Sequence, residues 1–260
     1  MFDTLTESGF AVLAYLLNLD RSTDRLQHMT EQFARIGYPF ERVAGVDGHA
    51  FTQNQLSDFG ARRPLHTQWS AGLAGCLLSH LKVWRIIAEA DGPFAAVFED
   101  DVHFALDMAA LLGSTEWIPR DASVVRLESN SRMILKPGRT IAPAPGRRLH
   151  EAVSGSWGSA GYIISQRAAE SAAAAPESWH HSPDSFLFKP GSTPFAATLR
   201  RYQVKPAVCI QDMLLKKSDA TMQSLVESEW ATLLAKREKP PSLLKRLLPR
   251  NRKEPVPFFP

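Results

Sequence analysis

Residues 94–102 run Phe-Ala-Ala-Val-Phe-Glu-Asp-Asp-Val, a short apolar segment that ends in three consecutive acidic residues. The preceding Asp91-Gly92-Pro93 stops a helix, and five unbroken apolar residues are typical of a strand buried on both faces of a parallel sheet. Glu99, Asp100 and Asp101 therefore lie at the carboxyl end of a predicted strand. Ligands of open α/β sheets bind beyond the carboxyl ends of the strands, so this acidic cluster predicts a ligand site.

Strand and helix patterns alternate on the amino-terminal side of this segment. Residues 10–17 form another continuous apolar run, which predicts a strand. A helix follows, with Ser22 or Thr23 as its cap and Gly37 as its stop, because apolar residues recur at spacings of three and four. The residues with that spacing are Leu26, Met29, Phe33 and Ile36. With a short strand predicted over 40–46, this is a βαβ unit that begins a parallel sheet.

The remaining segments extend the same alternation. The predicted elements are a loop or short helix over 49–70, a helix over 73–90, strands over 123–127, 161–165 and 203–210, a loop or irregular hairpin over 132–150, and a helix over 167–175. Strands that alternate with helices indicate an α/β fold, with a mostly parallel central sheet flanked by helices.

Length and composition fit one domain with an appendage. The chain has 260 residues, of which 44% are hydrophobic and 22% charged, values ordinary for a protein with a large buried core. We expect one domain over residues 1–215 and a separate tail over 216–260. The two cysteines, Cys76 and Cys209, form no C-x-x-C pair, which argues against a zinc ribbon or a disulfide framework. We interpret both as reduced, buried thiols of a cytosolic protein.

Neither a signal peptide nor a membrane span is expected. The apolar run over 10–17 is too short to cross a bilayer and has no basic segment before it. We expect no other segment to approach the length of a membrane-spanning helix. The sequence thus predicts a cytoplasmic protein.

The tail is basic, with eight basic and two acidic residues between 236 and 254. Residues 242–248 form a short amphipathic pattern between prolines. One interpretation is attachment to an anionic membrane surface, and the other is a solvated tail. The sequence leaves both open. A nucleic-acid-binding protein is a poor fit, because the basic residues gather in the tail and no nucleic-acid motif is present.

The acidic cluster predicts a metal site. Carboxylates packed this closely repel one another, and a divalent cation relieves that repulsion. Oxygen ligands suit Mn²⁺ or Mg²⁺, and the absence of a nearby cysteine argues against zinc. On a strand, Glu99 and Asp101 project to one side and Asp100 to the other, so Glu99 and Asp101 are the predicted metal ligands. The alternative is an acidic strand end that caps the next helix.

A second set of polar residues follows the strand over 10–17. Residues 18–25, Asn-Leu-Asp-Arg-Ser-Thr-Asp-Arg, lie where a strand ends and a helix begins, and a helix N-terminus favours anions. Arg25, one turn inside the helix, is placed to reach a phosphate or a carboxylate. The alternative is an internal ion pair of Arg25 with Asp47 or Asp20.

Several motifs in order resemble glycosyltransferase family 25, the lipopolysaccharide and lipooligosaccharide biosynthesis family. The motifs are Leu16 to Arg25, Phe40 to Gly48, Gly75-Cys76-Leu77-Leu78-Ser79-His80, Phe98-Glu99-Asp100-Asp101-Val102, Gly161 to Ser165, and Pro183-Asp184-Ser185. The resemblance covers residues 10 to 212. It departs from the family pattern two residues before Gly75, where an acidic residue is frequent and this chain has Leu73.

The resemblance implies a GT-A-like nucleotide-sugar-binding fold and a catalytic domain over 1–215. It also implies a nucleoside-diphosphate sugar donor, with a UDP-hexose and galactose as the favoured case. The implied acceptor is a lipooligosaccharide, a lipopolysaccharide or a related glycan or glycolipid. The work of such an enzyme would place it in the cytoplasm or on the cytoplasmic face of the inner membrane.

The chemistry of glycosyl transfer assigns expected roles. A divalent cation, Mn²⁺ or Mg²⁺, held by Glu99 and Asp101 would stabilise the departing nucleoside diphosphate, and nearby carboxylates would stabilise an oxocarbenium-like transition state. Asp184 is the expected catalytic base, with a simple turn residue after Pro183 as the alternative. His80 is expected to contact the donor or the acidic cluster. The alternative is a core histidine whose ring nitrogens are hydrogen-bonded within the protein. The residues expected to bind the nucleotide-sugar are Asn18, Asp20, Arg21, Arg25, Ser79, His80, Lys82 and Asp100.

Two other functions compete with a transferase. A divalent-metal phosphohydrolase would use the same acidic cluster, but the Asp-x-Asp pattern of aspartyl-phosphate enzymes is missing after the first strand, where Asn18-Leu19-Asp20 stands. A catalytically inactive, transferase-like binding protein is the other alternative, supported by Leu73 and the basic tail.

Overall fold

The computed structural model describes residues 11–62, 69–142, 144–155, 157–176, 180–214 and 254–258. Its strands are β1 (Leu13–Asn18), β2 (Glu41–Ala44), β3 (Phe94–Glu99), β4 (Val102–Phe104), β5 (Val124–Arg126), β6 (Asn130–Met133), β7 (Leu135–Lys136), β8 (Arg148–Ala152), β9 (Gly161–Ser165), β10 (Arg201–Lys205), β11 (Cys209–Gln211) and β12 (Glu254–Val256). Its α-helices are α1 (Thr23–Ile36), α2 (Gln53–Ala61), α3 (Ala71–Glu89), α4 (Met108–Leu112), α5 (Gln166–Ala174), α6 (Pro183–Phe188) and α7 (Pro194–Thr198), and its 3₁₀ turns are η1 (Gly48–Ala50) and η3 (Asp212–Leu214).

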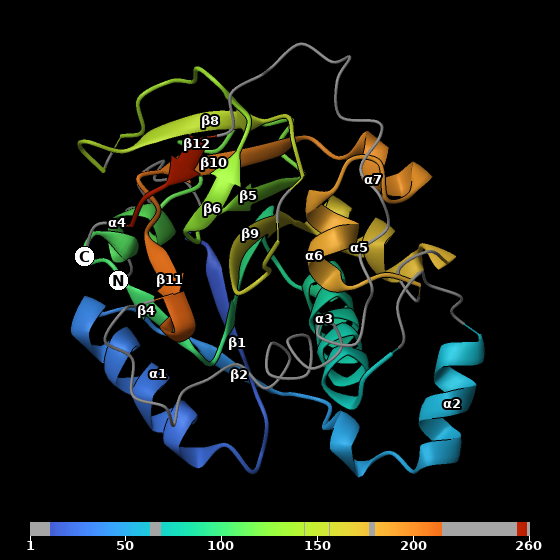
Figure 1. Ribbon diagram of the computed structural model, residues 1–260. Coiled ribbons are helices and arrows are strands. Elements are labelled where there is room, and N and C mark those ends of the chain that lie inside the picture. Colours follow the sequence, from blue (N-terminus) through green and yellow to red (C-terminus); the bar gives the residue numbers. More distant parts are fainter. Residues whose placement is uncertain are drawn as a thin grey trace.

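Eight strands form the central sheet in the order β2-β1-β3-β9-β5-β10-β8-β7. The pairings give six strands that run in one direction, whereas β9 and β8 run the opposite way. Helices cover both faces (Figure 1). The predicted α/β fold with a mostly parallel sheet flanked by helices is therefore confirmed. Strand β9 lies antiparallel between β3 and β5, an orientation that its apolar sequence alone did not specify.

Two apolar layers hold the helices to the sheet. On one face, Met29 and Phe33 of α1 and Leu111 of α4 pack against the strands, and all three are buried. On the other face, α3, α5 and α6 form a second layer, which includes Leu77 and Phe186. These layers cover both faces of β1 and β3, which explains why both strands are apolar at every position before their last residues, Asn18 and Glu99.

The βαβ unit predicted from the spacing of apolar residues is present as β1, α1 and β2. Strands β1 and β2 pair in parallel, with Leu17 opposite Val43. Helix α1 ends at Gly37, whose φ of 66° is the left-handed conformation that a glycine adopts without strain. The Gly37 amide donates a hydrogen bond to the Ala34 carbonyl at the end of α1, and the chain re-enters the sheet at Glu41.

Helix α3 begins at Ser70, whose side chain accepts a hydrogen bond from the Leu73 amide. Contrary to the expectation that no segment is long enough, α3 has the length and composition of a membrane-spanning helix. More than half of the most apolar 18-residue stretch of α3 is buried inside the protein, against α5 and the sheet. Its apolar character is thus explained by a place in the core.

Two further two-stranded sheets complete the fold. The predicted strand over 203–210 is wrong as a single element, because the chain leaves the central sheet at Pro206, which has no amide hydrogen to donate, and resumes as β11. Strand β11 pairs with β4, and β12 pairs with β6. Residues 254–258 thus lie against the body that holds residues 11–214, and Val256 is buried. The remainder of the predicted tail, including the basic segment over 242–248, lies outside the described residues.

Candidate active site

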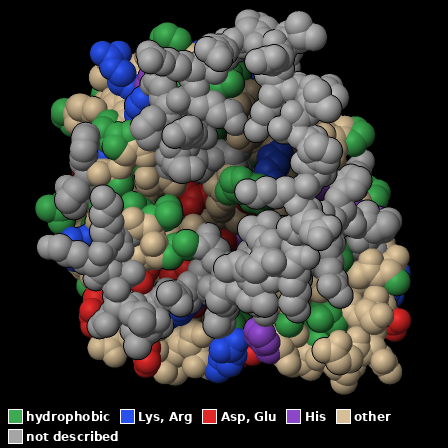
Figure 2. Space-filling model, in the orientation of Figure 1, with side chains coloured by type: hydrophobic (Ala, Val, Ile, Leu, Met, Phe, Trp, Pro, Cys, Tyr) green, Lys and Arg blue, Asp and Glu red, His purple; other side chains and the backbone are tan. Residues whose placement is uncertain are grey.

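A cleft opens at the carboxyl edge of β1, β2 and β3, where the three strands face α3. It has a volume of about 660 Å³ including its mouth. The lining residues are Leu17, Asn18, Leu19, Arg21, Arg25, Gly45, Val46, Asp47, Gly48, His49, Gly72, Gly75, Cys76, Ser79, His80, Glu99, Asp100 and Asp101. Acidic side chains are visible within a hollow near the middle of the face shown in Figure 2. The acidic cluster and the 18–25 segment, 74 residues apart in sequence, therefore share one cleft.

Asp100 is held by residues from two other elements. Its carboxylate accepts hydrogen bonds from Asn18 Nδ2 and from Arg25 NH1, each at 2.8 Å. Asn18 is in turn fixed by Arg42 of β2, whose Nε donates to Asn18 Oδ1 at 2.9 Å. The predicted alternative partners of Arg25 were Asp47 or Asp20, but its carboxylate partner is Asp100. Asp100 therefore links the end of β3 to β1 and α1 through hydrogen bonds.

Glu99 and Asp101 also line the cleft, and within the described residues neither carboxylate forms an ion pair with an arginine or a lysine. Burial raises the pKa of Glu99 to about 7, while a hydrogen bond from Ser159 acts in the opposite direction. Burial, and then the charge of Glu99, raise the pKa of Asp101 to about 8. The Glu99 side chain is 24% exposed and Asp101 is 2% exposed, so burial penalises the charge of Asp101 more. Two neighbouring carboxylates with raised pKa values are suited to a cation.

His80 belongs to a buried hydrogen-bond chain. Trp84 Nε1 donates to the Tyr162 hydroxyl at 2.8 Å, and that hydroxyl lies 2.8 Å from His80 Nδ1. His80 Nε2 lies 3.3 Å from Glu99 Oε1. Burial lowers the pKa of His80 to about 3, so the imidazole is neutral at pH 7 and its contact with Glu99 is a hydrogen bond. Tyr162, which was not among the expected site residues, thus orients a histidine that faces the carboxylate.

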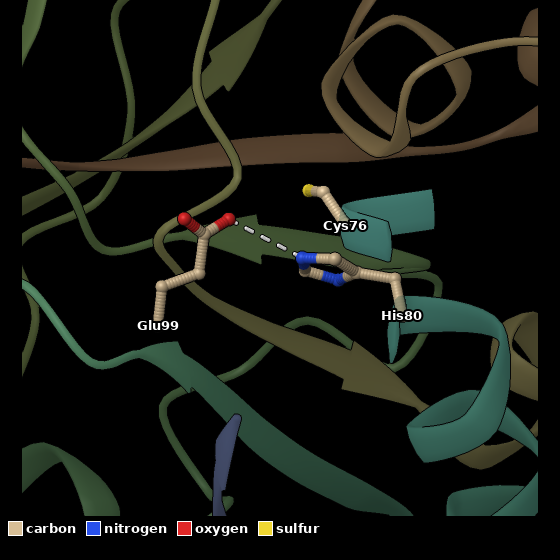
Figure 3. A group of neighbouring side chains, drawn as sticks. All are labelled: Cys76, His80 and Glu99. Carbon is tan, nitrogen blue, oxygen red and sulfur yellow. Dashed lines mark hydrogen bonds and ion pairs between the residues drawn. The ribbon is translucent and has the colours of Figure 1, made fainter. Parts of the chain in front are cut away.

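Cys76 stands beside this pair. The ligand atoms of Cys76, His80 and Glu99 all lie within 4.8 Å of one another, and Figure 3 shows the three side chains turned toward a common space. The sequence argument that no cysteine lies near the acidic cluster is therefore wrong. Cys76 precedes Glu99 by 23 positions, and the packing of α3 over β3 brings them together.

Close backbone packing shapes the part of the cleft lined by Gly48 and Gly75. A Cβ on Gly48 would lie 1.8 Å from the Ala71 carbonyl oxygen, and one on Gly75 would lie 2.5 Å from that of Val46. Ser79 fastens the same contact, since its Oγ accepts from the Val46 amide at 2.8 Å and donates to the Gly75 carbonyl at 2.7 Å. Glycine at both positions lets α3 touch the loop between β2 and η1.

An ion pair lies at the mouth of the cleft. Arg21 Nε and Asp47 Oδ2 are 2.5 Å apart, and the Asp47 carboxylate also accepts from the His49 amide. The Arg21 guanidinium lowers the pKa of Asp47. Both side chains are partly exposed, so the pair adds little stability, but it places a guanidinium where an anion would enter.

Asp184 lies in the neighbourhood of the cleft, on α6 rather than in a turn. It is the second residue of that helix, after Pro183, and is 9% exposed. It is not among the residues that line the cleft, and its charge acts to raise the pKa of Cys76, His80 and Glu99. The buried Arg201 holds the carboxyl end of α6 by donating to the Leu187 carbonyl at 2.6 Å.

Two predicted binding residues lie away from the cleft. The Asp20 side chain is 80% exposed and pairs with Arg42, and Lys82 donates from Nζ to the Ala44 carbonyl at 2.8 Å. Neither lines the cleft. Lys82 follows His80 by two residues, which is about 200° around the helix, so it projects away from the buried face that carries His80.

The buried ion pair between Arg126 and Glu128 was not predicted from the sequence. Arg126 and Glu128, two residues apart at the end of β5, are joined through Arg126 NH2 and Glu128 Oε1 at 3.0 Å, and both are almost fully buried. Arg126 also donates to the Trp157 and Gly158 carbonyls, and Glu128 accepts from the Ala160 amide. Because the intervening Ser159 donates to Glu99, this pair holds the loop that supports the acidic cluster.

The raised pKa values predict how stability depends on pH. Each acid has a folded-state pKa above its unfolded value, so its burial is without penalty below about pH 4 and fully penalised above about pH 8. The melting temperature of the metal-free protein is expected to fall as pH rises from 5 to 8. Thermal unfolding in chelator should show this slope, and Asp101→Asn should flatten it. An equal slope in both proteins would contradict the assignment.

The carboxylate-lined cleft at the carboxyl edge of the sheet defines an α/β protein with a candidate ligand-binding site. The chain belongs to glycosyltransferase family 25, described as an LPS biosynthesis protein family, whose sequence model matches residues 12–187. It is therefore a glycosyltransferase, and the resemblance seen in its motifs is confirmed. The residue that departs from the family pattern, Leu73, is buried in the core at the start of α3.

The relatives agree with this family. The chain is 26% identical to the lipooligosaccharide biosynthesis protein lic2B of Haemophilus influenzae, over 86% of this chain and 85% of that protein. It is 26% identical to the lacto-N-neotetraose biosynthesis glycosyltransferase LgtB of Neisseria meningitidis serogroup A, over 83% and 81%. It is 29% identical to procollagen galactosyltransferase 1-A of Xenopus laevis, over 60% of this chain and 27% of that protein. A solved glycosyltransferase involved in glycosylation of the PBCV-1 major capsid has 12% identity and a TM-score of 0.41, over 84% of this chain and all of that one.

Proposed function

We propose that this protein transfers galactose or a related hexose from a nucleoside-diphosphate sugar, a UDP-hexose in the first instance, to a lipooligosaccharide, lipopolysaccharide or related glycan. One observation carries the proposal: Glu99 and Asp101 share a cleft at the carboxyl edge of the sheet, both with raised pKa values. The names of relatives that make lipooligosaccharide and lacto-N-neotetraose support the acceptor class, and a procollagen galactosyltransferase supports the sugar.

The donor set fits a hard divalent cation. Carboxylate oxygens are preferred ligands of Mn²⁺ and Mg²⁺, and the oxygens of Asp100 are already engaged by Asn18 and Arg25. Glu99 and Asp101 would therefore hold the ion, while Asp100 fixes the end of β3. When bound, the cation supplies neutralising charge for the diphosphate leaving group.

The elements around the carboxylates suit the anionic half of a donor. Helix α1 starts at the cleft, and a helix N-terminus favours an anion through its dipole and its amide groups. Arg21 and Arg25 line the same wall. We assign nucleotide-sugar binding to this side, together with Asn18, Ser79 and His80. Asp20 and Lys82 have no place in this assignment.

Asp184 is the proposed base for the acceptor hydroxyl. It lies on α6, which packs against α3, and its charge acts on both His80 and Glu99. A carboxylate on the far side of the donor would accept the proton as the hydroxyl attacks. Water is kept from the buried side of the site by Tyr162 and Trp84, which are fully buried.

The proposed setting is the cytoplasm or the cytoplasmic face of the inner membrane, where a growing glycolipid is available. The basic segment over 236–254 supports a surface contact of this kind, because each basic residue near an anionic surface contributes about 1 kcal/mol.

A donor screen tests the proposal. The full-length protein is incubated with UDP-, GDP- and CMP-sugars in Mn²⁺, with a lactose- or glucose-terminated oligosaccharide acceptor, and free nucleotide is measured. We expect release from a UDP-hexose that depends on the acceptor and stops in chelator. A phosphohydrolase would instead cleave simple phosphate esters, and an inactive binding protein would shift its melting temperature with a nucleotide-sugar yet release no nucleotide. Either of those results would contradict the proposal.

A further inference from the structure

The cluster of Cys76, His80 and Glu99 has a donor set that differs from that of the carboxylates alone. Cys76 and His80 are four residues apart on α3, so their side chains project from the same face of the helix, one turn apart. Glu99 meets them from the end of β3. The Nε2 of His80 and the Oε1 of Glu99 are 3.3 Å apart, and the three ligand atoms all lie within 4.8 Å.

These distances suit a small tetrahedral ion. Bonds of 2.0–2.3 Å place the ligand atoms of a tetrahedral zinc site about 3.3–3.8 Å apart. The His80–Glu99 pair already has that separation, and the Cys76 sulfur, within 4.8 Å of both atoms, needs to approach them by at most about 1.5 Å. All three residues line the cleft, so an ion can enter and a fourth ligand position faces the cleft.

The surroundings also favour a metal-ligating histidine. His80 Nδ1 is bonded to the Tyr162 hydroxyl at 2.8 Å, and Trp84 fixes that hydroxyl. A partner on one ring nitrogen orients the other toward the ion, which is the usual support of metal-bound histidines. A thiol, an imidazole and a carboxylate form a set that Zn²⁺ prefers and that Mn²⁺ and Mg²⁺ do not.

We propose that Cys76, His80 and Glu99 form a Zn²⁺ site at the base of the cleft, and that zinc bound there inhibits sugar transfer. Binding replaces the S–H bond of Cys76 by a Zn–S bond and displaces the proton shared by His80 Nε2 and Glu99 Oε1. The thiol proton passes to solvent, and the displaced proton passes to His80 Nδ1 or to solvent. Inhibition follows because zinc takes up an oxygen and the negative charge of Glu99, which would otherwise hold the divalent ion of the donor. The inhibition rests on the transferase function proposed above, whereas zinc binding does not.

Cobalt provides a direct test of the site. Co²⁺ replaces Zn²⁺ in such sites, and its bond to a thiolate gives a near-ultraviolet charge-transfer band. The chain has two cysteines, so Cys76→Ser should remove the band and Cys209→Ala, a matched control, should retain it. Competition with a chromophoric chelator should show zinc affinity at least tenfold weaker in Cys76→Ser, since even second-sphere partners of a metal contribute about 10–100-fold. Far-ultraviolet circular dichroism checks that each variant is folded.

The results separate the two parts of the proposal. A band that is absent from the native protein, or that survives Cys76→Ser, would overturn the zinc site whatever the outcome for sugar transfer. In the transfer assay with Mn²⁺ in excess, added zinc should inhibit the native enzyme and require at least about tenfold more metal in Cys76→Ser. Zinc binding without inhibition would contradict the regulatory part. If no donor is used at all, the proposed function fails while the cobalt titration still decides the site.

Discussion

Replacing Asp101 with Asn is expected to lower the rate of nucleotide release from the donor by about 100-fold or more, because fixed charge aimed at the reacting group is typically worth at least that factor. The side chain is 2% exposed, and both its charge and that of Glu99 are penalised by burial. Asn keeps the shape and one oxygen of the carboxylate but removes the charge that would hold a divalent cation. The loss should therefore appear in kcat and in the apparent affinity for Mn²⁺.

The same substitution should leave the fold intact or more stable. Asp101 makes a weak contact, 3.5 Å, with Gln211 Nε2, and no partner of opposite charge is bonded to it among the described residues. Removing a buried charge relieves a penalty, so thermal unfolding in chelator should show an equal or higher melting temperature. Asp58→Asn, on the exposed face of α2, is the matched control. Full transfer activity in Asp101→Asn would refute the role of this carboxylate.

Gly48→Ala is expected to destabilise the protein by about 3 kcal/mol, the upper part of the range for overpacked sites. The new Cβ would meet the Ala71 carbonyl oxygen at 1.8 Å and its carbon at 2.6 Å. Both are backbone atoms at the start of α3, so α3 or the loop must move. Because that loop carries Asp47 and His49 of the cleft wall, the affinity for the nucleotide-sugar should fall as well.

Gly191→Ala provides the control for this comparison. A Cβ at Gly191 would meet nothing within 4 Å, so its unfolding free energy should change by less than about 1 kcal/mol. Urea unfolding of the native protein and both variants measures the difference. Equal stability of Gly48→Ala and Gly191→Ala would show that α3 and the loop are not packed backbone to backbone.

Local pattern was sufficient to predict the elements that build the site. The apolar run before Glu99 predicted β3, and Gly37 predicted the end of α1, because each depends on neighbours in sequence. The rule that ligands bind at strand carboxyl ends then joined residues 18–25 to the acidic cluster, and the cleft contains Asn18, Arg21 and Arg25. The same rule placed Asp20 in the cleft wrongly, because Asp20 lies in the turn after the strand and its side chain points outward to Arg42.

Contacts between distant segments could not be predicted in this way. Cys76 reaches Glu99 through the packing of α3 on β3, and the hydrogen-bond chain from Trp84 through Tyr162 to His80 joins α3 to β9. The strand that pairs with β6 comes from residues 254–256, beyond a long intervening segment. Each of these depends on tertiary packing, for which a single sequence carries no periodic signal.

The central claim is that Glu99 and Asp101 hold a cation that carries the diphosphate of the donor. A crystal of the full chain grown with Mn²⁺ and UDP, with anomalous diffraction measured at the manganese edge, tests it most directly. We predict a manganese peak in contact with carboxylate oxygens of Glu99 and Asp101, with the diphosphate on the same ion and beside the start of α1. Ordered UDP bound elsewhere, or bound in this cleft with no manganese at these two carboxylates, would contradict the account.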